Sequence, residues 1–146
     1  MKRILIVEDG TEYLDAFTRL SAPGSATFVR TGSLAEALAR LDAEPFDGLF
    51  LDVVFDRTPV DELAGDLDAL ITRFGGDRER AVRQLAENQG FYVLDAVAPR
   101  LPAEFPVVIA YDFSDEPQRF ERLRKRVPRL SGLPDGASIS KALELF

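Results

Sequence analysis

The sequence predicts an α/β fold with a doubly wound, five-stranded parallel sheet. Short apolar runs, such as residues 4–7 (ILIV) and 107–110 (VVIA), alternate along the chain with stretches whose apolar residues recur at helical spacing. The short runs are apolar on both faces, which is typical of strands buried within a parallel sheet. Strands that alternate with helices indicate parallel connections. The chain has 146 residues, which is the length of one ordinary domain.

The first half of the chain contains three predicted strands and two predicted helices. The strands are residues 4–7, residues 26–29 and residues 49–54, the last of them interrupted by Asp52. The helix after the first strand ends at Pro23-Gly24, a pair that breaks helices. The second helix begins at Ser33, because Glu36 follows it at capping-box spacing.

The second half contains two more strands, and the third and fourth strands are far apart in the sequence. Residues 107–110 and 129–133 are the predicted strands, and a helical pattern follows each of them. Residues 57–89 do not fit simple alternation. They include an apolar stripe over residues 63–74, which predicts an additional helix that Gly75-Gly76 ends. We therefore expect a single domain over residues 1–146, with residues 57–89 as a helical insertion.

Composition excludes several classes of function. The chain has no cysteine and no histidine, so disulfides, thiol catalysis, a Ser-His-Asp triad and His-ligated metals are excluded. A net charge of −7 disfavours binding to nucleic acid. No apolar run approaches the ~18 residues that a membrane span needs, and the N-terminal apolar run is too short for a signal peptide. We therefore expect a cytoplasmic protein that binds neither membranes nor nucleic acid.

Three carboxylates follow two of the predicted strands. Glu8 and Asp9 end the first strand, and Asp52 lies near the end of the third. In a flavodoxin-like strand order, 2-1-3-4-5, the first and third strands are neighbours, so these side chains are expected to converge. Like charges that pack together cost stability unless a cation joins them, and Mg²⁺ prefers oxygen ligands. Glu8, Asp9 and Asp52 are therefore the predicted ligands of a weak Mg²⁺ site.

Four segments carry a resemblance to a known family. They are residues 4–9 (ILIVED), 33–38 (SLAEAL), 46–52 (FDGLFLD) and 105–109 (FPVVI). In their order and spacing they make the chain resemble the receiver domain of bacterial two-component response regulators. The resemblance implies that Asp52 is the phosphoacceptor and that Glu8 and Asp9 position Mg²⁺. It also implies a signalling module of a phosphorelay, not an enzyme, whose partner is a signalling protein such as a histidine kinase.

Two positions depart from the receiver pattern. Receivers usually carry Thr or Ser after the fourth strand and a Lys-Pro pair after the fifth, where this chain has Tyr111 and the pair Leu133-Pro134. These replacements remove the hydroxyl and the lysine that read the phosphoryl group, so the resemblance is to an atypical receiver or pseudo-receiver. Arg57 replaces the usual proline five residues after the acceptor; we expect a solvated loop arginine, with a substitute cation as the alternative.

Two surface features are candidates for contact with a partner. The stripe over residues 63–74 packs on the domain's own core or, alternatively, forms a partner surface. Residues 119–129 hold six basic residues and one acidic residue, which is typical of a helix C-terminus and also offers a docking strip for an acidic partner. A homodimer would form through residues 57–89 or through the face made by the last two helices and the last strand.

The alternative function is a Mg²⁺-dependent phosphotransfer or nuclease domain of the Toprim kind. Residues 6–8 (IVE) and 110–115 (AYDFSD) are similar to that family. The acids Asp112 and Asp115 are one position further apart than the Asp-x-Asp pair of Toprim domains. The acidic net charge also disfavours an enzyme that acts on nucleic acid.

Overall fold

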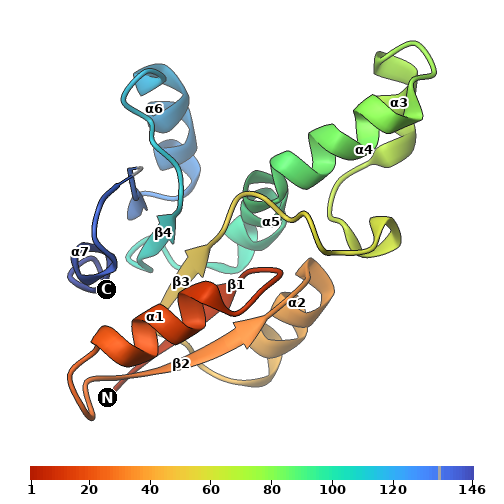
Figure 1. Ribbon diagram of the computed structural model, residues 1–146. Helices are drawn as coiled ribbons and strands as arrows, with labels where there is room; N and C mark the ends of the chain where they lie inside the picture. The colour runs from red at the N-terminus through yellow and green to blue at the C-terminus, as the bar shows by residue number, and fades with distance from the viewer. Residues whose placement is uncertain (135) are drawn as a thin grey trace.

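All five strands are parallel, in the order β2-β1-β3-β4-β5, in the computed structural model, which describes residues 1–134 and 136–146 (Figure 1). The strands are β1 (Lys2–Val7), β2 (Ala26–Thr31), β3 (Gly48–Leu51), β4 (Val107–Ile109) and β5 (Leu130–Gly132). This confirms the predicted fold class and strand order. Val53 and Val54 lie outside β3, so the third strand ends before Asp52.

Helices cover both faces of the sheet. They are α1 (Glu12–Leu20), α2 (Leu34–Ala43), α3 (Leu67–Arg73), α4 (Arg78–Glu87), α5 (Gln89–Val97), α6 (Pro117–Arg126) and α7 (Ile139–Leu143), with short 3₁₀ turns η1 (Val60–Glu62) and η2 (Ala98–Arg100). Alternate residues of a strand face opposite sides. Accordingly, Leu5 and Val7 pack with residues of α2, α5 and α6, whereas Ile6 packs with residues of α1 and α7.

Residues 57–89 contain η1, α3 and α4, and the two helices extend away from the sheet beyond α5 (Figure 1). Leu70, Ala81 and Leu85 form a small apolar core of their own. The predicted helix over residues 63–74 is too long, because α3 begins only at Leu67. Gly65 has a left-handed φ of +111°, which interrupts a right-handed helix, and the Asp66 side chain caps α3 by accepting a hydrogen bond from Ala69 N at 3.0 Å.

The start of α5 is anchored to the end of β3. The Gln89 side chain is buried; it accepts from Ala64 N and donates to Ala64 O, both at 2.8 Å. These bonds tie the loop before α3 to the first turn of α5. Gly90 N donates to Val53 O at 3.2 Å, which brings the same turn against the residues that follow β3.

Across the described residues, none of the helices is both long enough and apolar enough to cross a membrane.

Candidate functional site

The structure brings the predicted acidic residues to one edge of the sheet. Val7 pairs with Leu51 across β1 and β3, so the residues that follow each strand lie side by side. Asp52 N donates to Val7 O at 3.0 Å, which fixes Asp52 directly beside the β1–α1 loop. Carboxyl ends of neighbouring parallel strands are the usual place for a binding site in this architecture.

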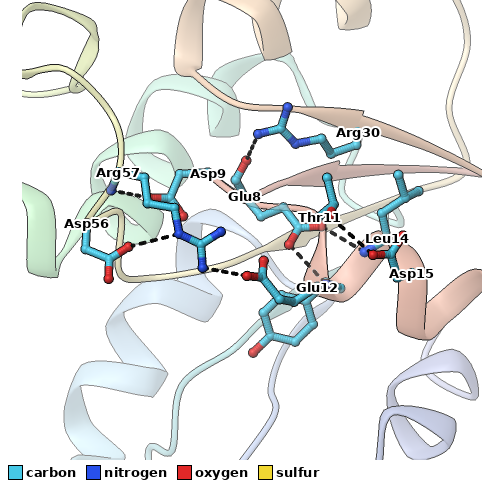
Figure 2. Close-up of polar contacts among 10 residues, drawn as sticks. Glu8, Asp9, Thr11, Glu12, Leu14, Asp15, Arg30, Asp56 and Arg57 are labelled. Atoms are coloured by element: carbon cyan, nitrogen blue, oxygen red, sulfur yellow. Dashed lines mark hydrogen bonds and ion pairs between the residues drawn. The ribbon is translucent and has the colours of Figure 1, made fainter.

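Glu8 has a structural role at this edge. Its carboxylate accepts hydrogen bonds from Tyr13 N at 3.0 Å and Leu14 N at 2.8 Å, and therefore caps the first turn of α1 (Figure 2). The Glu8 side chain is buried, and burial raises its pKa, while the two amide bonds oppose that rise. Arg30 donates to the Glu8 main-chain oxygen at 2.9 Å. Both carboxylate oxygens of Glu8 are thus already used within the protein.

Asp9 faces the loop that follows β3. Its Oδ2 accepts a hydrogen bond from Arg57 N at 2.7 Å (Figure 2). Asp9 is half-buried. This bond ties the β1–α1 loop to a residue five positions beyond Asp52.

Among the acids at this edge, Asp52 has the largest shift in pKa. Its Oδ1 accepts from Val53 N at 2.9 Å. The pKa of Asp52 is raised to about 6, chiefly by burial and also by the negative charges of Asp9, Glu8 and Glu12, while the bond from Val53 N opposes the rise. At pH 7 the carboxylate is mostly ionised, so it can act as a nucleophile.

The backbone around Asp52 is closely packed. A Cβ atom on Gly90 would lie 2.5 Å from Asp52 O and 3.0 Å from Val53 Cα. Only glycine at this position lets the first turn of α5 approach so closely. Gly90 therefore belongs to the candidate site, where it lets the first turn of α5 pack against Asp52.

The three carboxylates predicted to hold Mg²⁺ differ in what else they bind. Among the described residues, no group of three or more acidic side chains is arranged to hold a metal ion. Glu8 is committed to α1, which leaves Asp9 and Asp52. Two carboxylates with water in the remaining positions still fit Mg²⁺, which is commonly held by one or two carboxylates.

Tyr111 lies in a network that joins three segments. Its hydroxyl donates to Glu116 Oε2, and Arg119 Nη1 donates to the Tyr111 oxygen at 3.4 Å and to Glu116 Oε1 at 3.2 Å. The Arg119 guanidinium carbon lies 3.9 Å from the ring centroid of Phe91 in α5. The Tyr111 ring packs edge-on against Phe91 and Phe113, with centroids 5.0 and 4.9 Å away. Hydrogen bonds and ring contacts therefore fix the β4–α6 loop to α5.

Leu133 belongs to the core. Its side chain is buried with Phe17, Phe50 and Ala142, between the sheet and helices α1 and α7. The position of the usual receiver lysine thus carries an apolar side chain that packs away from the acidic edge.

Asp112 and Asp115, the acids of the alternative function, lie in the loop after β4. Asp112 Oδ1 accepts from Ser114 N at 2.9 Å, and this bond lowers the pKa of Asp112. Asp115 is exposed. Asp112 therefore closes a local turn.

No sequence pattern indicates the contacts made by Glu12, Glu116 and Arg119. Glu12 pairs with Arg57, and the other two hold Tyr111. Acidic and basic residues in and next to the first turns of helices are common, so no local pattern distinguishes these side chains.

Solved structures with a similar fold include the receiver domain of the Francisella response regulator 1452. It superposes with a TM-score of 0.61 and 12% sequence identity, over 99% of this chain and 93% of that chain. A yeast Spc42 trimeric coiled-coil segment, amino acids 181–211, fused to another protein, matches with a TM-score of 0.58 and 16% identity, over 99% of this chain and 75% of that one. No family model and no curated protein matches the sequence. The chain therefore has the fold of a receiver domain.

Proposed function

We propose that this chain is an atypical receiver module that acts in phosphorelay signalling through protein–protein contacts, with Asp52 as its phosphoacceptor. The observation that carries the proposal is the position of Asp52, directly after the central strand β3 and beside the β1–α1 loop. A carboxylate oxygen of Asp52 attacks phosphorus, and the bond from phosphorus to the donor nitrogen of a kinase breaks as the new P–O bond forms. Mg²⁺ held by Asp9 and Asp52 would neutralise charge on the phosphoryl oxygens.

The module is atypical because the two side chains that read a phosphoryl group are replaced. Tyr111 is held by Glu116 and Arg119, and Leu133 is buried in the core. A ligand shifts a two-state equilibrium only by its differential affinity for the two states. A phosphoryl group at Asp52 is therefore expected to change the conformation of α6 and β5 very little.

The signal to a partner protein then depends on surfaces that do not change on phosphorylation. Segment 57–89, which projects from the sheet, is the first candidate for contact with a signalling partner or a second copy of the chain (Figure 1). The basic strip over residues 119–129 is the second. A histidine kinase is the proposed phosphoryl donor.

The test is modification of Asp52 by beryllofluoride in the presence of Mg²⁺, followed by amide chemical shifts. Wild type is expected to form the adduct, with shifts around Asp9 and Asp52 and little change over residues 111–133. Asp52→Asn should form no adduct, whereas Asp61→Asn, which alters an exposed acid of η1, should behave as wild type. Failure of wild type to form the adduct would remove Asp52 as phosphoacceptor. A large cooperative change over residues 111–133 would restore an ordinary phosphorylation switch.

A further inference from the structure

Arg57 connects three carboxylates at the acidic edge of the sheet. Its backbone N–H donates to Asp9 Oδ2 at 2.7 Å, its Nη2 donates to Glu12 Oε1 at 2.5 Å, and its Nε lies 3.8 Å from Asp56 Oδ1 (Figure 2). Asp9 lies in the β1–α1 loop, Glu12 begins α1, and Asp56 belongs to the same loop as Arg57. The guanidinium therefore bridges the loop after β3 to the first residue of α1.

The bridge lies directly over the backbone between Asp9 and α1. A Cβ atom on Gly10 would lie 2.1 Å from Glu12 Oε2 and 2.3 Å from Arg57 Nη1. Glycine at position 10 thus leaves the space that the bridge uses. Any cation that approaches Asp9 from this side meets the guanidinium.

The charges agree with this geometry. The pKa of Arg57 is raised, first by its hydrogen bond to Glu12 and also by the charges of Glu12, Asp9 and Asp56. The pKa of Glu12 is lowered, chiefly by the same bond. The positive charge of Arg57 therefore stabilises carboxylates that would otherwise repel one another.

The bridge is exposed enough to open. The side chains of Arg57 and Glu12 are 58% and 63% exposed. Exposed ion pairs of this kind contribute little and break easily in water. The Arg57 guanidinium can therefore neutralise the carboxylates at this edge, and its ion pair with Glu12 can break when another cation binds there.

We propose that Arg57 is the resident counter-ion of the acidic edge, and that its bridge to Glu12 competes with a divalent cation for that edge. The competition with Mg²⁺ rests on the function proposed above, in which Asp9 and Asp52 are the ligands. This role goes beyond a solvated loop arginine, because it makes Arg57 a residue that sets the metal affinity of the site.

The test is the Mg²⁺ affinity of wild type and Arg57→Gln, measured from amide chemical shifts of Gly10 and Asp52. Arg57→Gln keeps the backbone N–H that donates to Asp9 and removes only the guanidinium. The variant is expected to bind Mg²⁺ about fivefold more tightly, which corresponds to about 1 kcal/mol. Arg57→Lys keeps the charge and should stay closer to wild type than Arg57→Gln does.

Arg126→Gln is the matched control. Arg126 pairs with Asp95 at 2.7 Å, with side-chain exposures of 51% and 54%, and it ends α6 away from the acidic edge. It changes the net charge by the same amount, and its Mg²⁺ affinity should equal that of wild type. Equal affinities of Arg57→Gln and Arg126→Gln, or no binding to any variant up to about 20 mM Mg²⁺, would overturn the role of Arg57.

Failure of the two proposals can be told apart. If Asp52 forms no beryllofluoride adduct but Arg57→Gln still binds Mg²⁺ more tightly, the phosphoacceptor assignment is wrong and the counter-ion assignment stands. If the adduct forms with the same Mg²⁺ dependence in wild type and Arg57→Gln, the counter-ion assignment is wrong and the phosphoacceptor stands.

Discussion

The buried carboxylate of Glu8 accepts a hydrogen bond from the backbone amide of Leu14 at 2.8 Å, six positions along the chain. With the parallel bond from Tyr13 N, this contact makes Glu8 the cap of α1, for which the side chain of Thr11 supplies no capping bond. The amides in the first turn of a helix have no partner inside the helix, so a nearby carboxylate stabilises them. An acid that the sequence assigns to a metal site therefore also holds the adjoining helix in place.

Glu8→Ala is expected to lower the free energy of unfolding by about 2 kcal/mol, because it removes a cap and leaves the half-buried amides of Tyr13 and Leu14 unpaired. Glu8→Gln keeps one acceptor oxygen and should lower the free energy of unfolding by less than Glu8→Ala does. Urea unfolding at pH 7 measures both. Glu121→Ala, which removes an exposed carboxylate from α6, serves as control and should stay within about 0.5 kcal/mol of wild type. A Glu8→Ala variant as stable as this control would contradict the capping role.

Asp52→Asn is expected to make the metal-free protein about 1 kcal/mol more stable than wild type at pH 7. The pKa of Asp52 is raised from 3.8 to about 6, so the folded state binds the proton more tightly than the unfolded state does. Wild type therefore loses stability as the pH rises from about 4 to 6. Asparagine removes the charge and keeps an oxygen for Val53 N.

Urea unfolding between pH 4 and 8 in the presence of a chelator checks this prediction. The two proteins should be equally stable near pH 4 and should diverge up to about pH 6, with a constant difference above that pH. If Asp52→Asn instead loses more than about 1 kcal/mol at pH 7, Asp52 acts mainly as a structural acceptor.

Asp9→Asn is expected to abolish Mg²⁺ binding, because Asp9 and Asp52 are the two proposed ligands. Wild type should bind Mg²⁺ with an affinity in the millimolar range, as a site with few carboxylates and many waters does. Amide shifts during a Mg²⁺ titration give the affinity, and Asp61→Asn is the control for loss of one negative charge. Binding that is unchanged in Asp9→Asn would place the metal elsewhere.

Tyr111→Phe is expected to lower the free energy of unfolding by about 1 kcal/mol. The substitution removes the hydroxyl that bonds to Glu116 and Arg119 but keeps the ring packed on Phe91. Amide hydrogen exchange over residues 112–116 should become faster. Tyr92→Phe is the control, because no hydrogen bond to the Tyr92 hydroxyl is present among the described residues. Exchange that is equally slow in Tyr111→Phe and wild type would show that ring packing alone holds the loop.

Gly90→Ala is expected to destabilise the protein by about 1–3 kcal/mol. Its Cβ would lie 2.5 Å from the main-chain oxygen of Asp52, and neither backbone can move without separating α5 from β3. Gly48→Ala is the comparison, because its Cβ meets the side chain of Phe146, also at 2.5 Å. A side chain moves more easily than backbone, so Gly48→Ala should lower the free energy of unfolding by less than Gly90→Ala does. Thermal unfolding of both variants decides the order.

Local sequence pattern is enough to predict the sheet and the position of the acids. Apolar runs such as residues 4–7 are typical of buried strands, and their alternation with helical patterns predicts parallel pairing, which the structure confirms. Once β1 and β3 are neighbours, Asp9 and Asp52 must lie at the same edge of the sheet. Local pattern also fixed the start of α2, where Ser33 accepts from Glu36 N at 3.2 Å.

The role of each side chain at that edge depends on contacts that form only when distant segments come together. Glu8 and Asp9 are adjacent acids in the sequence, yet Glu8 turns into α1 and Asp9 meets a loop 48 positions away. Arg57 likewise pairs with Glu12 in α1, and Gly90 packs against Asp52. Tyr111 bonds to Glu116 through the fold of the loop after β4. Periodicity records which face of an element is buried, whereas a hydrogen bond between distant segments depends on how loops close, and that leaves no repeating signal in the sequence.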